Sequence, residues 1–274
     1  MNKVLIYDCD GVLGDTEQYG HLPAFNQMWR EFGVAWEWSL EEYGRKLKIG
    51  GGKERMSSLF AEPDFLRVFT PPATEQERTD LIATWHKRKS AIYREIVNSG
   101  RIPPRSGVKR LAEEALGQGW SLAVASTSAP ESVDAMLRRA VGDVTAARFS
   151  LVLGGDIVKA KKPAPDIYLL VAERLGVRSA ECLVIEDSNN GLRAAVSAGM
   201  KSVITVSEYT REEDFSEADI VLSCLGDPGG EICQVLDNRS GACPGAWFSV
   251  EDLETVLAAA AYSPRSQQPM SVQG

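Results

Sequence analysis

The stretch Val4-Leu5-Ile6-Tyr7-Asp8-Cys9-Asp10-Gly11 decides the fold of this chain. Four apolar residues run without interruption into a pair of aspartates and a glycine. A short continuous apolar run of this kind is typical of a strand that is buried on both faces of a parallel sheet. The Asp-x-Asp-Gly sequence then lies at the carboxyl end of that strand, which is where open α/β sheets bind their ligands.

Further apolar runs of the same kind recur along the chain, and segments with helical periodicity separate them. This alternation predicts an α/β fold built on a doubly wound parallel sheet. The predicted strands are 4–7, 121–125, 151–153, 182–185, 202–206 and, more weakly, 219–222. The predicted helices between the later strands are 107–116, 131–140, 165–175 and 191–198.

A helical domain is predicted between the first two strands. The interval holds no convincing strand, and its helical candidates are 24–32, 40–47, 54–60 and 74–97. Paired prolines, Pro103 and Pro104, forbid helix continuation and mark the second boundary. We therefore expect an α/β core of residues 1–15 and 103–262 and an inserted helical cap domain of residues 16–102.

The interior of the cap and the C-terminal part of the chain can also be predicted. Residues 226–245 are rich in Gly, Pro and Asn, which is typical of a long loop. Ser249 is a suitable N-cap for a helix that runs to residue 261, and residues 263–274 are expected to be disordered. The aromatic residues expected to form the interior of the cap are Trp29, Phe32, Trp36 and Trp38.

The charge and hydropathy of the chain limit its partners. Its 38 acidic residues outnumber its 30 basic ones, for a formal charge of −8. This argues against binding to nucleic acid or to an anionic membrane surface. No apolar run reaches the roughly 18 residues of a membrane-spanning helix, and no leader sequence is evident, so a cytoplasmic location is expected. No obligate protein partner is evident.

Histidine and cysteine are scarce, which limits the chemistry. Because His21 and His86 are the only histidines, a zinc site built on several histidines cannot be assembled. Neither accompanies the G-x-S-x-G sequence of a serine hydrolase. The five cysteines include no C-x-x-C pair and are expected to be free thiols. Cys9 is expected to pack in the core, because alternation along the strand turns it away from its two aspartate neighbours.

Polar side chains follow several of the predicted strands. Asp8 and Asp10 follow the first strand, Ser126-Thr127-Ser128 follow the second, and Glu186-Asp187 follow the strand at 182–185. Lys162 precedes a predicted helix. Each of these alone has another interpretation, as a turn, a helix cap, a strand end or a solvated loop residue.

Together these polar residues predict a magnesium and phosphate site. Three carboxylates that converge at one edge of a sheet repel one another unless a cation or protons intervene. Mg²⁺, a hard cation that takes oxygen ligands, is the simplest remedy. Such a site attracts an anionic ligand, and Ser126 and Lys162 are suited to hold a phosphate group.

The same motifs, taken as a set, resemble those of the haloacid dehalogenase superfamily. The four matching stretches are Asp8-Cys9-Asp10-Gly11-Val12-Leu13, Ser126-Thr127-Ser128, Lys162-Pro163-Ala164-Pro165-Asp166 and Glu186-Asp187-Ser188. The helical insertion resembles the C1-type cap of that superfamily. The resemblance extends from residue 3 to about residue 222.

This resemblance implies Mg²⁺-dependent phosphoryl transfer through an aspartyl phosphate. Asp8 would be the nucleophile and a metal ligand. Asp10 would be the general acid and base, with its backbone carbonyl also on the metal. Asp187 and Glu186 would complete the metal ligands, and the residues holding the transferring phosphoryl group would be Ser126, Thr127, Ser128 and Lys162.

Polar features of the cap resemble the CbbY-like branch, whose activity is that of a xylulose-1,5-bisphosphate phosphatase. Basic residues near two predicted helix ends favour a second phosphate or a sugar pocket, although a solvated helix face and a helix-joining turn are alternative interpretations. The resemblance implies that the substrate is contacted by Glu17, His21, Gly52, Lys53, Arg55, His86, Arg88 and Lys89.

Two other functions stay open. The related beta-phosphoglucomutases share the cap type and the core motifs, and a mutase would return the phosphoryl group to the sugar. In the mutase the cap histidine follows a tyrosine directly, whereas here Gly20 intervenes before His21, which weakens that interpretation. A non-catalytic phosphosugar-binding regulator is the third hypothesis, and the intact acidic motifs argue against it.

Overall fold

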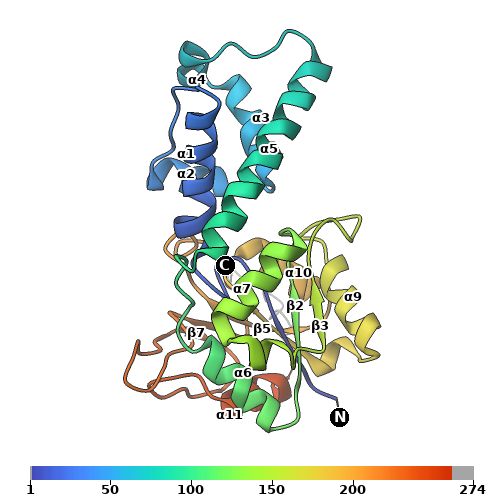
Figure 1. The fold of residues 1–274 in the computed structure, drawn as a ribbon. Helices are drawn as coiled ribbons and strands as arrows, with labels where there is room; N and C mark the ends of the chain where they lie inside the picture. Colours follow the sequence, from blue (N-terminus) through green and yellow to red (C-terminus); the bar gives the residue numbers. More distant parts are fainter. Residues whose placement is uncertain (1, 261–274) are drawn as a thin grey trace, which may run out of the picture.

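Strand β1 (Val4–Tyr7) is an interior strand of a seven-stranded sheet in the computed structural model, which describes residues 2–260. The strand order is β3-β2-β1-β4-β5-β6-β7, and the first six strands in sequence run parallel (Figure 1). The other strands are β2 (Ser121–Ala125), β3 (Leu151–Leu153), β4 (Cys182–Glu186), β5 (Lys201–Thr205), β6 (Ile220–Leu222) and β7 (Val235–Asn238). The predicted doubly wound α/β fold is confirmed.

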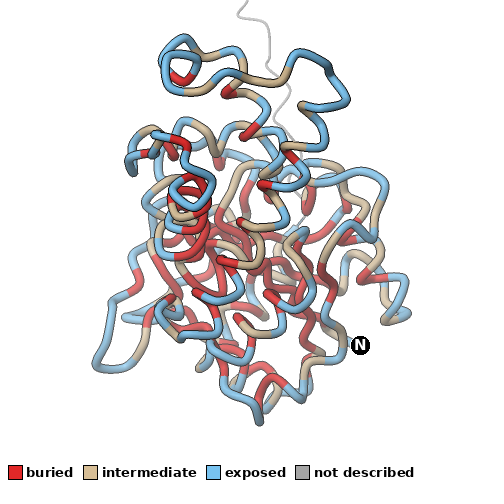
Figure 2. The backbone as a smooth tube through the Cα atoms, turned by 45° about the horizontal axis from the view of Figure 1, so that its top comes forward, coloured by how far each residue is buried: buried red, intermediate tan, exposed pale blue. Residues whose placement is uncertain are grey.

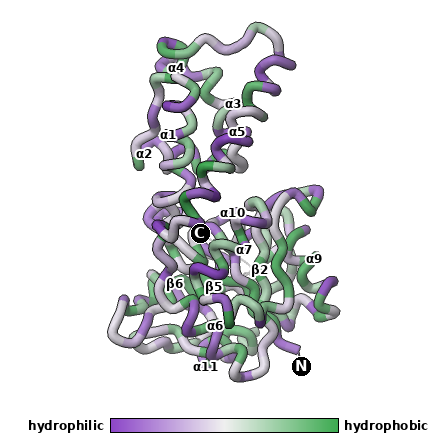
Figure 3. The backbone as a smooth tube through the Cα atoms, in the orientation of Figure 1, coloured by the Kyte–Doolittle hydropathy of each residue, from purple (hydrophilic) through white to green (hydrophobic). Residues whose placement is uncertain are grey.

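Helices cover both faces of the sheet. Leu5 and Tyr7 pack with one group of helices, and Val4 and Ile6 pack with another, because successive side chains of a strand point to opposite faces. The first face is covered by α6 (Val108–Gly117), α7 (Pro130–Val141) and α11 (Val250–Ala258), and the second by α9 (Asp166–Leu175) and α10 (Asn189–Ser197). The buried residues gather in the sheet layer, and the hydropathic colouring is apolar around β2 (Figures 2 and 3).

The segment Glu17–Asn98, between β1 and α6, contains helices and no strand and lies beyond the carboxyl ends of the strands (Figure 1). Two of its helices begin with capping boxes, Ser39 with Glu42 and Thr74 with Glu77. Its elements are a π-helix (Glu17–His21), α1 (Leu22–Glu31), α2 (Leu40–Leu47), α3 (Gly52–Ser58), a 3-10 turn (Leu59–Ala61), α4 (Pro63–Val68) and α5 (Glu75–Asn98). That residues 16–102 form a domain of their own stays a prediction.

Aromatic packing holds this helical segment together. The rings of Trp29 and Trp38 are buried and perpendicular, with centroids 4.5 Å apart, and Trp36 packs edge-on against Phe65. Phe32 is 42% exposed, so its predicted place in the interior is wrong. It is the C-cap of α1, where the chain leaves the helix and turns through a glycine.

The C-terminal part of the fold departs from the expectation in two places. Residues 226–245 are not all loop, because β7 pairs antiparallel with β6 at the edge of the sheet. All four residues of β7 are exposed, so backbone pairing rather than burial forms this strand. Helix α11 ends at Ala258 instead of residue 261, since Ala259 adopts an extended conformation. The predicted disordered tail, 263–274, lies outside the described residues.

Some shorter helical elements were not predicted. These are α4, α8 (Asp143–Ala146) and a 3-10 turn at Ser179–Glu181, each too short to show helical periodicity in the sequence. Cys9 is buried in the hydrophobic core, as predicted, and all five cysteines are free. Within residues 2–260, no helix has both the length and the apolar character to cross a membrane.

Shortening Ile6 in the interior strand β1 should destabilise the fold. Its side chain is fully buried among β2, β4 and the helices of the second face. We expect Ile6→Ala to lower the free energy of unfolding by about 2–5 kcal/mol, and Ile6→Val by about 0.5–1.5 kcal/mol, because the cavity left behind is smaller. Denaturant unfolding measures both, and equal losses in the two variants would contradict this account.

Candidate active site

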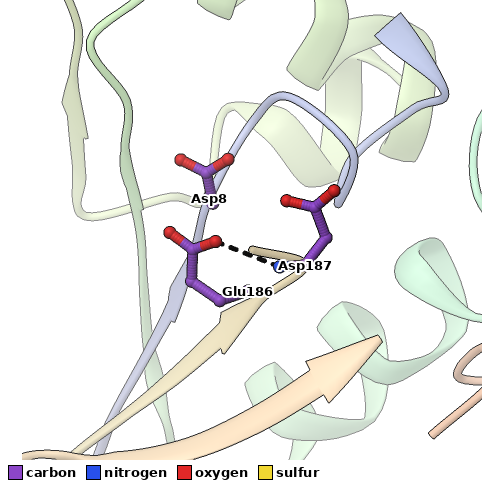
Figure 4. Close-up of side chains that lie close together, drawn as sticks. All are labelled: Asp8, Glu186 and Asp187. Atoms are coloured by element: carbon purple, nitrogen blue, oxygen red, sulfur yellow. Dashed lines mark hydrogen bonds between the residues drawn. The ribbon is translucent and has the colours of Figure 1, made fainter. Parts of the chain in front are cut away.

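Three acidic side chains meet at the carboxyl ends of two adjacent strands. Parallel pairing sets Tyr7 beside Ile185, so Asp8 follows β1 at the level where Glu186 ends β4. Asp187 comes next in the chain. Figure 4 shows the three carboxylates facing a common space, and oxygen atoms from all three lie within 4.8 Å of one another. The predicted convergence at this edge is therefore present in the structure.

Lys162 lies between two of these carboxylates. Its Nζ is 2.5 Å from Asp8 Oδ1 and 2.7 Å from Glu186 Oε1, and it also donates to the Ala125 carbonyl at 3.2 Å. The Tyr168 hydroxyl donates to the same Glu186 oxygen at 2.7 Å. Burial lowers the pKa of Lys162, but the two carboxylates outweigh burial and raise that pKa well above its usual value. The ammonium group is therefore held charged beside Asp8.

One lysine does not balance three buried carboxylates. Burial, opposed by Lys162 and reinforced by Glu186, raises the pKa of Asp8 to about 8. Burial and the charges of Glu186 and Asp8 raise the pKa of Asp187 well above its usual value. Such a cluster of hard oxygen donors with excess negative charge fits Mg²⁺.

The backbone at this edge leaves space beside the carboxylates. Gly11 has φ of +77°, and a Cβ there would lie 2.1 Å from Asp187 Oδ2. A Cβ on Gly191 would lie 1.9 Å from the Glu186 carboxyl group. Both positions therefore require glycine. The carboxylate oxygens of Asp8, Glu186 and Asp187, with the space that these glycines leave for them, are consistent with the predicted metal site.

Asp10 lies in a different environment, with its side chain turned toward hydroxyl groups. Oδ1 accepts hydrogen bonds from Thr16 at 2.7 Å and Tyr93 at 3.1 Å, and Oδ2 accepts from Ser128. Burial alone would raise the pKa of Asp10, but the nearby His21 and these hydroxyls lower it below its usual value. Its side chain is not among the clustered carboxylates of residues 2–260, and the predicted role of its carbonyl stays a prediction.

His21 reaches Asp10 in spite of the inserted Gly20. Its Nε2 lies 3.2 Å from Asp10 Oδ1, and its Nδ1 lies 2.7 Å from Lys89 Nζ. Residues Glu17–His21 form a π-helix, in which the Leu22 N–H bonds the Glu17 carbonyl, and a π-turn holds one residue more than an α-turn. The extra glycine therefore does not carry the histidine away from Asp10, and Gly20 does not count against a mutase.

Glu17 and Arg55 form a second polar group in the helical segment. The buried Tyr43 hydroxyl donates to Glu17 Oε2 and accepts from Arg55 Nη1 at 3.1 Å. Arg55 also donates to the Ile49 carbonyl at 2.9 Å. Burial lowers the pKa of Arg55, but Glu17, Tyr43 and the more distant Asp10 raise it above its usual value. These two predicted substrate residues are thus brought together on the side of Asp10.

Of the other predicted cap residues, Gly52, His86 and Lys89 lie in buried or partly buried surroundings, whereas Arg88 forms ion pairs within the helical segment. Gly52 lies against His86, and burial together with Lys89 and Lys53 lowers the pKa of His86 to about 4. Burial likewise lowers the pKa of Lys89 to about 8. Arg88 instead pairs with Glu31 and Glu95. Its side chain is therefore already engaged by two carboxylates of the helical segment, and its expected substrate contact stays a prediction.

The serine motif after β2 lies beside the cluster. Ser126 is buried, and its Oγ accepts from the Ser128 backbone N–H at 3.1 Å. Ser128 reaches Asp10, whereas Thr127 is exposed. The phosphate-binding role of all three residues stays a prediction.

Sequence reasoning missed the tyrosines of the site, Tyr43, Tyr93 and Tyr168. Each lies on a helix within an apolar stripe, and nothing in its sequence neighbourhood distinguishes it from a core residue. Only the contacts of their hydroxyl groups with buried carboxylates reveal them. The site is therefore larger than the conspicuous acidic motifs.

The chain is similar to known proteins of one hydrolase family. Residues 2–199 match the family model of haloacid dehalogenase-like hydrolases. A CBBY-like protein of Arabidopsis thaliana is 43% identical over 229 residues, which are 84% of this chain and 71% of that protein. The CbbY protein of Cupriavidus necator is 41% identical over 257 residues, which are 93% of this chain and 96% of that protein.

Solved structures agree with these relatives. A CbbY variant from Rhodobacter sphaeroides, crystallised in complex with xylulose-(1,5)bisphosphate, superposes with a TM-score of 0.70 at 36% identity, covering 82% of this chain and 95% of that one. A beta-phosphoglucomutase from Clostridium difficile gives a TM-score of 0.61 at 23% identity, covering 82% and 92% of the two chains. The second likeness concerns the fold alone.

The metal-free chain should lose stability as the pH rises toward 8. Asp8 has a pKa of about 8 when folded and an ordinary value of 3.8. Protonation of Asp8 therefore stabilises the folded state fully below pH 3.8, and the contribution is lost as the pH rises through 8. In EDTA, we expect the free energy of unfolding to fall by about 1–3 kcal/mol between pH 5 and pH 8.

Denaturant unfolding at several pH values measures how the free energy of unfolding changes with pH. Two variants show which group causes the change. Asp8→Asn removes the titrating group and should flatten the slope. Asp64→Asn changes an exposed carboxylate that pairs with Arg67 on the surface, and should keep it. An unchanged slope in Asp8→Asn would assign the pH dependence to other groups.

Proposed function

The chain belongs to the haloacid dehalogenase-like hydrolase family and is a phosphatase, and on that premise we propose that it removes a phosphate group from a small sugar bisphosphate. The observation that carries this proposal is the contact of Lys162 with both Asp8 and Glu186, at the strand edge that also presents Ser126. This contact places the ammonium group of Lys162, which would bind the phosphoryl group, between the proposed nucleophile Asp8 and the carboxylates that would bind the metal. The bisphosphate held by the Rhodobacter CbbY variant supports xylulose-1,5-bisphosphate as the substrate.

In the first half of the proposed reaction, an Asp8 oxygen attacks the phosphorus atom. The bond to the sugar oxygen breaks, and an aspartyl phosphate forms on Asp8. The leaving oxygen takes a proton from Asp10, which must bind that proton when the substrate binds and is left as a carboxylate after the transfer. Lys162 orients Asp8 and stabilises the phosphoryl charge.

In the second half, water replaces the sugar. Asp10 takes a proton from this water, the water oxygen attacks the phosphorus atom, and the bond to Asp8 breaks to release inorganic phosphate. His21 and the hydroxyl groups around Asp10 lower its pKa, so after the first transfer Asp10 stays deprotonated and can accept the proton of the water. Asp8, Glu186 and Asp187 would hold Mg²⁺, which when bound neutralises the negative charge that gathers during transfer.

The helical segment supplies the groups for the rest of the substrate. Glu17 and Arg55 offer an acceptor for a sugar hydroxyl and a cation for the second phosphate. Lys89 adds a buried ammonium group beside them. A bisphosphate engages both the strand edge and this cluster, whereas a monophosphate engages only one.

A phosphate-release screen over sugar mono- and bisphosphates tests the proposal. We expect turnover with a ketopentose bisphosphate that depends on Mg²⁺ and is abolished by EDTA. Asp8→Asn should lower kcat by at least about a thousandfold, because the nucleophile is lost. Asp64→Asn, which alters an exposed pair in α4, should keep full activity.

Product analysis separates the alternatives. An isomeric sugar phosphate in place of free phosphate would reveal a mutase, which the contact between His21 and Asp10 does not oppose. Binding of the bisphosphate without turnover, with Mg²⁺ present, would reveal a regulator. Turnover that survives in Asp8→Asn would reject the aspartyl-phosphate mechanism.

A further inference from the structure

A loop of the α/β core makes a specific contact with the helical segment. Tyr209, in the loop after β5, packs edge-on against Tyr43 of α2, with ring centroids 5.9 Å apart and an interplanar angle of 82°. Edge-to-face packing of this kind is favourable because the positive ring edge meets the negative ring face. The two residues are 166 positions apart in the sequence (209 − 43), so no local pattern indicates the contact.

Gly44, next to Tyr43, makes room for the Tyr209 ring. A Cβ at Gly44 would lie 3.1 Å from Tyr209 Cδ1 and 3.5 Å from Tyr209 Cε1. Glycine costs helix stability relative to alanine in the middle of a helix such as α2. The glycine at this position therefore serves the approach of Tyr209 rather than the helix.

The loop that carries Tyr209 is anchored at both sides of the ring. The Ser207 backbone N–H donates to Thr210 Oγ1 at 2.9 Å, and the two hydroxyl groups lie 3.0 Å apart. Arg105 donates to the Val206 carbonyl at 2.7 Å. The Ser207 side chain acts to lower the pKa of Asp187, one of the three clustered carboxylates, so it lies near that carboxyl group. The loop is thus close to the carboxylate edge of the sheet.

On the other side of the contact, Tyr43 is the link between the two proposed substrate residues. Its hydroxyl bonds both Glu17 and Arg55, and its ring is fully buried. A shift of the Tyr43 ring therefore moves a carboxylate and a guanidinium group together. The Tyr209 hydroxyl has no hydrogen-bond partner among the described residues, so the ring alone makes the contact.

We propose that Tyr209 is a positioning residue, whose ring holds Tyr43 and thereby sets Glu17 and Arg55 at the correct distance from the carboxylate edge. This role rests on the proposed function, because Glu17 and Arg55 matter only if they contact the substrate. Through Ser207 and Tyr209, the core sets where the helical segment holds the distal part of the substrate.

Steady-state kinetics with two substrates tests this role. The first is the phosphosugar on which the unchanged chain has the highest kcat/KM, and the second is p-nitrophenyl phosphate, which has no distal phosphate. We expect Tyr209→Ala to raise KM for the phosphosugar by about 2- to 10-fold, the loss that corresponds to one aromatic pair. Because the carboxylate edge is untouched, kcat/KM for p-nitrophenyl phosphate should change less than that for the phosphosugar.

Two further variants separate positioning from a general loss of structure. Tyr209→Phe keeps the ring and should restore KM to within about twofold of the unchanged chain, since the hydroxyl has no partner. Gly44→Ala should raise KM while keeping or increasing stability toward denaturant, because alanine favours the helix. In the Tyr209→Ala background, Gly44→Ala should have no further effect on KM, because the Tyr209 ring that the added methyl group would displace is absent.

The outcomes that overturn the inference are distinct from those that overturn the proposed function. An unchanged KM for the phosphosugar in Tyr209→Ala would overturn it, and so would equal losses with both substrates or independent effects of Gly44→Ala and Tyr209→Ala. Hydrolysis of p-nitrophenyl phosphate but of no phosphosugar by the unchanged chain would instead reject the proposed function, and with it the role of Tyr209.

Discussion

The crowding of three carboxylates around one ammonium group is the constraint on which the rest of the site depends. Asp8, Glu186 and Asp187 are buried at adjacent strand ends, and Lys162 alone among the nearby cations touches two of them in the described chain. Burial of so much like charge is unfavourable unless a cation joins it. The cluster is therefore suited to bind a cation, and the bound cation would in turn attract a phosphate group.

The helical segment completes the site from the opposite side. Thr16, His21 and Tyr93 all bond Asp10, which belongs to the core, so both parts of the molecule surround the group that we propose to transfer protons. The buried apolar cluster is also continuous from the sheet into the helices. Because of these hydrogen bonds and this apolar packing, the position of the helical segment directly sets the environment of Asp10.

Local sequence patterns do not predict features of the structure that long-range contacts decide. Arg88 stands in a basic run that resembles an anion site, yet it pairs with Glu31 of α1, a partner that only the packing of α1 on α5 supplies. Strand β7 lies in a region whose composition is typical of a loop, and it forms because β6 leaves an open edge. In the π-helix, a wider turn absorbs Gly20, a compensation that residue counting does not reveal.

The sequence by itself determined the parallel sheet, the strand-end position of Asp8 and Glu186, and the family, because continuous apolar runs and the residues that follow them are local features. Tertiary structure alone decided which basic residues face the site and which tyrosines hold its carboxylates. It also decided that Tyr209 meets Tyr43. These contacts join residues far apart in the chain, and a side chain such as Tyr168 or Tyr43 shows the same apolar pattern whether its hydroxyl finds a buried carboxylate or not.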